Sequence, residues 1–255
     1  MSTNDRLEFF ALPGLPLIEP GDDLAALIVE ALEAAALNLK DGDVLVIAQK
    51  PVSKAEGRLR RLSEVRPGAE ARALAAAADK DPAMTQLILD ESRAILRQRP
   101  GVIISEHLSG VVLANAGIDR SNVSPDRDWV LLLPEDSDAS AQALRSRIMA
   151  ALGVSIGVII ADSVGRAWRM GTIGMALGCA GVEALVNLRG RRDMFGRVLE
   201  VSEHAVADAI AAAAELVLGE ADEATPVVIA RGLRQGHSTQ DSTVLLRPAA
   251  DDMFR

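Results

Sequence analysis

The chain is poor in aromatic residues and in positive charge. It contains no tyrosine, two tryptophans and four phenylalanines among 255 residues. Proteins that capture single-stranded nucleic acid stack the bases on aromatic side chains, which this chain barely supplies. Lys and Arg number 27 against 36 Asp and Glu, for a net charge of −9, whereas sequence-independent nucleic-acid binding needs a basic face. We therefore expect no nucleic-acid partner.

Cysteines and long apolar runs are also scarce. The single cysteine, Cys179, excludes an intramolecular disulfide and a multi-cysteine metal site, and it is expected to be a small buried apolar side chain. No uncharged run approaches the roughly 20 residues that a membrane-spanning helix needs. The start, MSTNDRLEFF, has no signal-peptide pattern. These absences predict a cytoplasmic protein with no membrane partner.

Three common phosphate-binding and catalytic motifs are missing as well. The sequence has no GxxxxGK[ST] loop, no GxGxxG fingerprint and no GxSxG elbow. Its strand and helix patterns do not alternate regularly. We therefore predict an α+β fold with mixed, mainly antiparallel sheets and packed helices, and not a Rossmann or P-loop fold. Residues 1–255 are expected to form one unit, in which a boundary near residues 66–100 would separate two subdomains.

Local patterns predict most of the elements. Two acids at 22–23 begin a helix that reaches about residue 37, and the apolar run at 44–48 is a strand. Turn and capping signals predict a hairpin turning at 108–110, a tight bend at Asp193 and Gly196, and helices over 137–152 and 202–218. The segment GEADEATPVVIARGL is expected to be an acidic loop followed by a strand. Residues 66–99 are expected to be mostly helix, broken at 81–82. Segment 51–58 is expected to be a loop that carries a basic cluster with Lys50, Lys54 and Arg58.

Carboxylates follow three apolar segments of the sequence. Asp119 ends VVLANAGID, Asp162 ends GVIIAD with Ser163 beside it, and Glu220 and Asp222 follow a helix. Hard cations such as Mg²⁺ and Mn²⁺ bind carboxylate, hydroxyl and phosphate oxygens. Each acid alone is more typical of a solvated loop than of a metal site. Asp162 is the strongest candidate, because a strand end is a rigid support.

Basic and glycine-containing segments offer contacts for anions. The turn LPGLP at 12–16 has a glycine that lets backbone N–H groups approach a ligand. The segment QKPVSK at 49–54 brings two lysines to the end of a strand. Arg166, Arg169 and the run RGRR at 189–192 supply forked donors suited to phosphate or carboxylate. For the RGRR run, a solvated charged surface is the default interpretation, whereas for segment 49–54 a solvated basic loop and an anion site are equally typical.

Taken together and in order, these segments resemble one family. LPGLP, DGDVLVIAQKPVSKAEGR, ANAGIDRSN, IIADSVGRAWRMGTIG, GRRDMFGR and GEADEATPVVIARG are similar to motifs of coenzyme F-420:L-glutamate ligases, from about residue 9 to about residue 247. The resemblance implies a GTP-dependent ligase that adds L-glutamate to a deazaflavin coenzyme precursor. It also implies a mixed α/β fold, a homodimer and two divalent ions, Mg²⁺ or Mn²⁺, with K⁺ as a further candidate ion.

The resemblance also implies roles for individual residues. The implied metal ligands are Asp119, Asp162, Ser163 and Glu220. The implied GTP contacts are Leu12, Pro13, Gly14, Leu15, Gln49, Lys54, Asn122, Gly219 and Ala221. Arg166 and Arg169 are the implied catalytic residues, facing phosphate or substrate carboxylate. In such a reaction the γ-phosphoryl group of GTP would activate a carboxylate as an acyl phosphate, which the glutamate amine then attacks.

Two departures and two alternatives accompany this interpretation. Relatives often read DSFGRPWR where this chain has Val164 and Ala167, a change that would loosen the loop or alter the substrate pocket. The chain ends at Arg255, so the flavin-dependent C-terminal domain of some relatives is expected to be absent. A metal-dependent nucleotide phosphohydrolase or a nucleotide-binding module would use the same carboxylates and basic groups.

Overall fold

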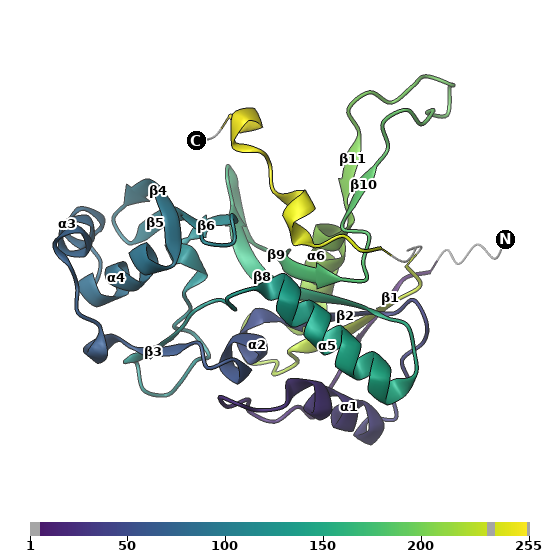
Figure 1. Ribbon diagram of the computed structural model, residues 1–255, viewed down its shortest axis with the longest axis horizontal. Coiled ribbons are helices and arrows are strands. Elements are labelled where there is room, and N and C mark those ends of the chain that lie inside the picture. Colours follow the sequence, from purple (N-terminus) through teal and green to yellow (C-terminus); the bar gives the residue numbers. More distant parts are fainter. Residues whose placement is uncertain (1–5, 234–237, 254–255) are drawn as a thin grey trace.

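A mixed five-stranded sheet forms the centre of the computed structural model, which describes residues 6–233 and 238–253 (Figure 1). The strand order is β1-β12-β2-β8-β9, where only the β2–β8 pair is parallel. The strands are β1 (Glu8–Ala11), β2 (Val44–Ala48), β8 (Gly157–Arg166), β9 (Arg169–Ala180) and β12 (Val227–Arg231). The fold is thus of the expected α+β class, with mostly antiparallel pairing.

Helices cover both faces of this sheet. Successive strand residues point to opposite faces, so Leu45 and Ile47 pack against one set of helices and Val44 and Val46 against another. Helices α1 (Leu24–Ala34) and α5 (Ser137–Leu152) cover the first face, and α6 (Val206–Leu218) covers the second. Alanines on α6 allow it to lie close to the sheet, and buried Cys179 packs in the same core, as expected.

A smaller unit with its own apolar core lies beside the central sheet, at the left of Figure 1. It consists of a three-stranded antiparallel sheet packed against two helices. Its elements are α3 (Ala69–Ala78), α4 (Pro82–Asp90), β4 (Ser92–Arg99), β5 (Val102–His107), β6 (Val112–Ala114) and η2 (Asn115–Gly117). The paired strands β3 (Leu59–Arg61) and β7 (Trp129–Leu131) connect it to the rest, and η1 (Leu62–Glu64) follows β3. The division into two subdomains near residues 66–100 stays a prediction.

A long arm projects from the molecule. The short pair β10 (Leu185–Asn187) and β11 (Glu203–Ala205) forms its base, and residues 188–202 extend beyond it (Figure 1). Asp193 accepts hydrogen bonds from the N–H groups of Phe195 and Arg197, which confirms the tight bend expected there. After β12 the chain continues through η3 (Ser242–Leu245) and η4 (Ala249–Asp251).

Several expected elements are confirmed and others are wrong. The hairpin turning at 108–110 and the helix over 137–152 are present. Residues 92–99 are strand β4 and not helix, because pairing with β5 overrides the helix-like composition of SRAILRQR. Helix α6 begins at Val206 and not at residue 202, since residues 203–205 pair with β10.

Two expected loops near the candidate residues are also wrong. Residues 49–55 form helix α2 (Gln49–Ala55), in which Pro51 is tolerated because the first turn of a helix needs no N–H partner. Residues 161–171 belong to a long hairpin, since β8 continues to Arg166 and β9 resumes at Arg169. Asp162 therefore lies inside a strand, opposite Met175, and not at a strand end.

Candidate active site

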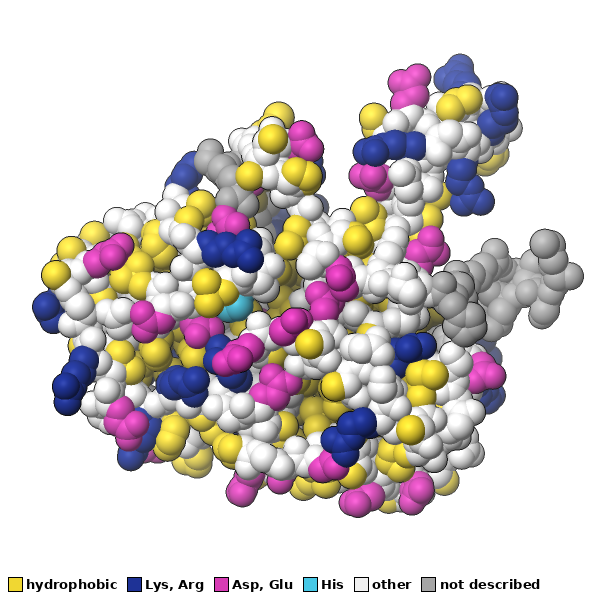
Figure 2. Space-filling model, in the orientation of Figure 1, with side chains coloured by type: hydrophobic (Ala, Val, Ile, Leu, Met, Phe, Trp, Pro, Cys, Tyr) yellow, Lys and Arg dark blue, Asp and Glu magenta, His cyan; other side chains and the backbone are white. Residues whose placement is uncertain are grey.

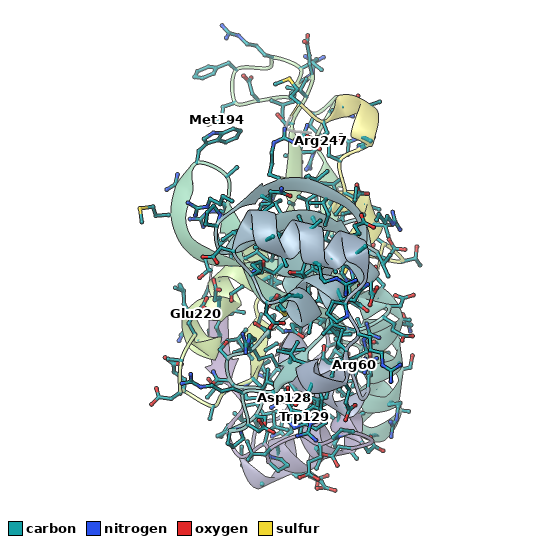
Figure 3. The ribbon with its side chains drawn as sticks, turned by 90° about the vertical axis from the view of Figure 1, so that its left-hand side faces the viewer. Arg60, Asp128, Trp129, Met194, Glu220 and Arg247 are labelled. Carbon is teal, nitrogen blue, oxygen red and sulfur yellow. The ribbon has the colours of Figure 1, made fainter. Side chains whose placement is uncertain are left out.

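A cleft of about 890 Å³ opens beside the end of the central sheet. Its walls come from the segment after β1, from α2, from residues 122–129, from β8 and β9, and from the loop between α6 and β12. Glu220 and Trp129 both line it, and both lie below Met194 in the view of Figure 3. Residues distant in the sequence thus converge on one polar space.

The first carboxylate beside the cleft, Asp119, is held by helix α2. The Gln49 side-chain amide donates to Asp119 Oδ2 at 2.7 Å, and Lys50 Nζ lies 3.1 Å from the same oxygen. Ser53 donates to Gln49 Oε1 at 2.8 Å, which fixes the amide so that its nitrogen faces Asp119. Because β2 leads directly into α2, both donors arrive at the end of the central sheet.

The second carboxylate, Asp162, lines the cleft from within β8. Burial, followed by the negative charge of Asp119, raises the pKa of Asp162 to about 7. The expectation of a solvent-facing loop acid is therefore wrong: the side chain is half-buried and competes with another negative charge. A carboxylate in that position favours a proton or a cation beside it.

The third carboxylate, Glu220, follows helix α6. Thr172 on β9 donates to Glu220 Oε1 at 3.0 Å. Hydrogen bonding with Glu215, and also with Thr172 and Ser163, lowers the pKa of Glu220. Gly219 ends the helix with φ of +75°, and a Cβ there would collide with the Glu223 carboxylate. Glycine is thus required where the chain turns to present Glu220.

Three of the expected GTP contacts form a connected network. Lys54 Nζ donates to the Asn122 carbonyl at 3.1 Å, and Asn122 Nδ2 donates to the Ala221 carbonyl at 2.8 Å. Asn122 has φ of +56°, a conformation that asparagine tolerates better than most residues. Burial, followed by the charge of Lys50, lowers the pKa of Lys54. The structure therefore brings α2, the segment after Asp119 and the segment after α6 to one wall of the cleft.

The LPGLP turn is only partly at the cleft. Leu15 lines it, and Pro13 and Gly14 are exposed. Leu12 is fully buried in the core between the sheet, α1 and α5, and its N–H donates to the Val227 carbonyl at 2.9 Å. The Leu12 side chain therefore has a packing role, and any ligand contact in this turn falls to its neighbours.

The arginines singled out in the sequence lie away from the carboxylates. Arg166 and Arg169 flank the turn of the β8–β9 hairpin, about 13 Å along the strand from Asp162 at roughly 3.3 Å per residue. Arg189 is on the arm, where it forms an ion pair with Glu203 at 3.1 Å. Arg58 is buried between Glu91 and Glu135, at 2.6 and 3.0 Å, so it does not join Lys50 and Lys54 at the cleft.

Several residues at the site were not identified from the sequence. Lys50 stands out only as a basic residue after a strand, although it pairs with Asp119. Glu215 lines the cleft from the last turns of α6, and Thr172 contacts Glu220 from β9. The one available signal for Glu215 was its place as the sole acid in the second half of an Ala-rich helix.

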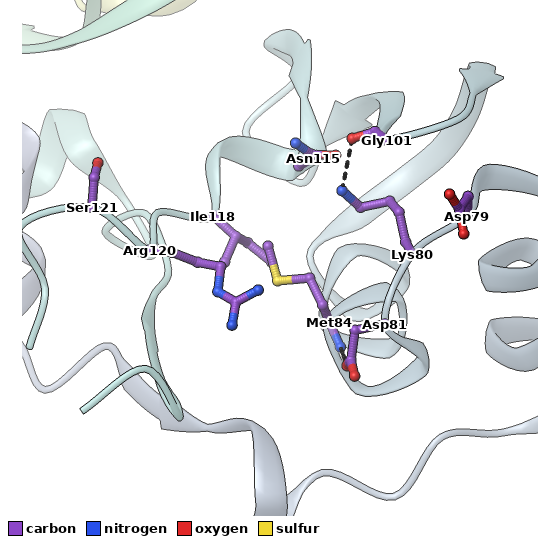
Figure 4. Close-up of a pocket in the computed structure, with 9 residues that line it drawn as sticks. All are labelled: Asp79, Lys80, Asp81, Met84, Gly101, Asn115, Ile118, Arg120 and Ser121. Atoms are coloured by element: carbon purple, nitrogen blue, oxygen red, sulfur yellow. Dashed lines mark hydrogen bonds between the residues drawn. The ribbon is translucent and has the colours of Figure 1, made fainter.

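A second, smaller pocket of about 470 Å³ lies in the adjoining unit (Figure 4). Arg120 and Ser121 line it, and Lys80 Nζ donates there to the Gly101 carbonyl at 3.0 Å. None of the candidate ligand or metal residues lines this pocket. The larger cleft is therefore the candidate active site.

The larger cleft combines negative charge with hydrogen-bond donors. Asp162, Glu215 and Glu220 supply carboxylates, whereas Lys50, Lys54 and backbone N–H groups supply positive charge and donors. Within residues 6–233 and 238–253, no three His, Cys, Asp or Glu side chains form a ready-made metal cage. In the same residues no helix is long and apolar enough to cross a bilayer. The lining suits an anionic ligand bound together with cations.

Comparison with known proteins gives one consistent result. A model of the family described as F420-0:Gamma-glutamyl ligase matches residues 14–232. The chain is 46% identical over 242 residues to the coenzyme F420:L-glutamate ligase of Methanopyrus kandleri, covering 93% of each protein. It is 45% identical over 251 residues to the protein of the same name from Methanothermobacter thermautotrophicus, covering 98% of this chain and 99% of the relative. The Archaeoglobus fulgidus ligase is 45% identical over 251 residues, with coverage of 98% and 97%.

Proposed function

Because the chain belongs to the F420-0:gamma-glutamyl ligase family, we propose that it adds L-glutamate to the deazaflavin precursor of coenzyme F420, using GTP. The chain is a ligase, and the relatives match it along nearly their whole length. The observation that supports GTP as co-substrate is the cleft itself, where Lys54, Asn122 and Ala221 meet next to three carboxylates. A phosphohydrolase or a binding module would share these groups, but the family favours ligation.

The chemistry requires an activated acid. A carboxylate oxygen of the precursor attacks the γ-phosphorus of GTP, GDP leaves, and an acyl phosphate forms. The glutamate amine then attacks the acyl carbon, inorganic phosphate departs, and the amine proton passes to solvent. All reactants are anions and the protein is itself acidic, with net charge −9, so local positive charge is needed to bring them together.

The residues of the cleft fit the divalent ions that the family resemblance implies. The fit rests on the donor set, since Asp162, Ser163, Glu215 and Glu220 line one cleft and the buried Glu215 Oε1 meets no N–H or hydroxyl donor among the described residues. Burial and the charge of Asp119 also raise the pKa of Asp162 to about 7. Asp119 and Asp162 would hold one ion, and Ser163 and Glu220 the other. Bound Mg²⁺ or Mn²⁺ would neutralise the charge that develops on the phosphates during transfer. No residue described above selects K⁺, which stays a prediction.

Other side chains position the reactants. Lys50 and the Gln49 amide orient Asp119, and Lys54 faces the wall where we place the nucleotide. Arg166 and Arg169 lie four or more residues along the hairpin from Asp162, and their expected catalytic role, facing phosphate or substrate carboxylate, stays a prediction. We assign them to the anionic groups of the substrates that lie farther from Asp162, since guanidinium groups bind carboxylate and phosphate through paired hydrogen bonds.

The surface supports the homodimer as part of this proposal. Apolar side chains are exposed along the arm, where Met194 is 94% exposed, Phe195 85% and Val201 81%. The hairpin tip adds Trp168 and Met170, which are 82% and 96% exposed. Figure 2 shows the arm standing clear of the main body. Apolar groups concentrated on projecting segments are typical of an interface, and a two-fold dimer would cover both copies of them.

The experiment combines purified protein, GTP, Mn²⁺ or Mg²⁺, L-glutamate and the deazaflavin precursor, with products identified by mass spectrometry. We expect GDP to accumulate in step with the glutamylated product. Rapid GTP hydrolysis that ignores both acceptors and yields no conjugate would favour the phosphohydrolase. Tight GTP binding without turnover would favour the binding module.

A further inference from the structure

Glu215 is a carboxylate at the cleft that is not among the ligands named above for the two divalent ions. It lies in the last turns of α6 and lines the cleft with Asp162, Ser163 and Glu220. Its Oε2 accepts a hydrogen bond from the N–H of Gly174 on β9. One oxygen is thus fixed by the backbone of the neighbouring strand, and this fixes the direction of the other.

The second oxygen meets no ordinary donor. Glu215 Oε1 is buried and accepts no N–H or hydroxyl hydrogen bond among the described residues, and hydrogen bonding with Glu220 would require a proton shared between the two carboxyl groups. Among the described residues, no lysine or arginine forms an ion pair with Glu215 or Glu220. A buried carboxylate oxygen left in this way is destabilising unless a proton or a cation satisfies it.

The carboxylate of Glu220 faces the same space. The two carboxylates are close enough to affect each other, since Glu220 contributes, after burial, to raising the pKa of Glu215. The hydroxyl groups of Ser163 on β8 and Thr172 on β9 form hydrogen bonds with the Glu220 carboxylate. Two carboxylates with nearby hydroxyl oxygens form the donor set that Mg²⁺ and Mn²⁺ prefer.

The packing of α6 keeps Glu215 in this position. A Cβ on Gly174 would collide with the Ala211 carbonyl oxygen, one helical turn before Glu215. Glycine at this place therefore allows the helix to lie directly on β9, and that close approach brings Glu215 to the Gly174 N–H. The position is built from backbone contacts on both sides and not from a flexible surface side chain.

We propose that Glu215 is a further ligand of the divalent ion that Ser163 and Glu220 would hold, with Oε1 as the ligating atom. This inference rests on the proposed function, because it requires the ions assigned there. It adds a ligand supplied by α6, so that the helix, the hairpin and the loop after the helix all contribute to one cation site.

The test measures Mn²⁺ binding by the full chain in wild type, Glu215→Gln and Glu33→Gln. Electron paramagnetic resonance reports the concentration of the free ion. Glutamine keeps the acceptor for the Gly174 N–H and removes only the charge. Glu33 is an exposed glutamate near the end of α1, which makes it a matched control. We expect Glu215→Gln to weaken one Mn²⁺ site by about tenfold or more, as for loss of a metal-supporting residue, and Glu33→Gln to bind as wild type does.

A thermal melt separates a ligand from a purely structural residue. Without metal, Glu215→Gln should melt at the same temperature as wild type or higher, because two facing carboxylates no longer repel. With Mn²⁺ its gain in melting temperature should be smaller than that of wild type. Unchanged Mn²⁺ affinity in Glu215→Gln, or a lower metal-free melting temperature with an unchanged gain, would overturn the inference. If wild type bound no Mn²⁺, the proposed metal site itself would fail.

Discussion

At the scale of single residues, the site depends on carboxylates that lie where burial and neighbouring negative charge disfavour their ionised form. Asp162 is half-buried beside Asp119, and its raised pKa measures the unfavourable free energy of its charge. The sequence indicated Asp119, Asp162, Ser163 and Glu220 as candidates, because each follows or interrupts an apolar segment. It did not indicate Glu215 or Lys50 as partners, since their relation to the other acids arises only when α6 and α2 pack on the sheet.

Replacement of Asp162 by asparagine tests the metal site at this scale. Asp162→Asn keeps the shape and removes the charge, so Mn²⁺ affinity should fall and ligation should drop by a factor on the order of a hundred or more. The fold should survive, because removal of a half-buried charge relieves repulsion from Asp119. Isothermal titration with Mn²⁺ and the ligation assay measure the two effects.

The control for this variant follows from the structure. Asp126 is unsuitable, because it contacts Arg61 at 3.3 Å and is next to Pro125, which lines the cleft. Asp79 is exposed and has φ of +48°, which asparagine accepts, so Asp79→Asn should bind Mn²⁺ and turn over as wild type does. Normal metal binding and turnover in Asp162→Asn would remove this residue from the site.

The raised pKa of Asp162 also predicts how the stability of the metal-free protein depends on pH. Between the ordinary value of 3.8 and about 7, the folded protein retains a proton that the unfolded chain has released. The free energy of unfolding should therefore fall as pH rises through this window. Carboxyls with lowered pKa, such as Asp23 and Asp128, lose their contribution only below that window.

Thermal melts in the presence of a metal chelator test whether stability falls as pH rises. The melting temperature of wild type should be lower at a pH of about 8 than at about 6, and Asp162→Asn should reduce that difference. Mn²⁺ should restore more stability at the higher pH, because the ion no longer competes with a proton. A melting temperature that rises with pH over this interval would contradict the assigned environment of Asp162.

At the scale of elements, the position of the site depends on how α6 and α2 meet the central sheet. The apolar runs and capping residues predicted β2, β12, α1 and α5 well, because the local sequence pattern of each element agrees with the structure that it adopts. They failed for α2, a helix of one or two turns that contains proline, and for β4, whose pairing with β5 is not local. They also ended β8 at Asp162, whereas the strand continues to Arg166 through pairing with β9.

Gly174 provides a test of the helix–sheet contact. Gly174→Ala would push a methyl group against the Ala211 carbonyl, so the free energy of unfolding should fall by about 1–3 kcal/mol, as for overpacking. Ligation should also fall, because α6 would carry Glu215 and Glu220 away from the hairpin. Denaturant unfolding and the ligation assay give the two measurements.

Gly165 in the same hairpin is the matched position. A Cβ there meets no atom within 4 Å, so Gly165→Ala should leave the free energy of unfolding almost unchanged. Equal losses of unfolding free energy in the two variants would mean that the contact between α6 and β9 is not the reason why glycine is needed at residue 174.

At the scale of the whole molecule, the projecting arm and hairpin are the features that a single chain leaves uncovered. The sequence predicted the bend at Asp193 but not that residues 188–202 extend away from the body. Their exposed Met194 and Phe195 are too far from the core to pack within the same chain, so we expect a second copy to cover them.

Substitution on the arm tests this association. Wild type should scatter light as a dimer of the 26.9 kDa chain, and the double variant Met194→Asp/Phe195→Asp should shift toward the monomer with its fold intact. Leu108→Ser, at an exposed turn outside the arm, should remain dimeric. A monomeric wild type at micromolar concentration would exclude the homodimer.

In the function proposed above, this cleft activates a carboxylate with GTP and then joins it to glutamate. The most direct measurement uses a precursor whose reacting carboxylate carries a heavy oxygen isotope, with the phosphate released during ligation analysed by mass spectrometry. An acyl-phosphate route predicts that each phosphate formed with a conjugate carries one heavy oxygen from that carboxylate. Phosphate without the label, released while conjugate accumulates, would contradict the account.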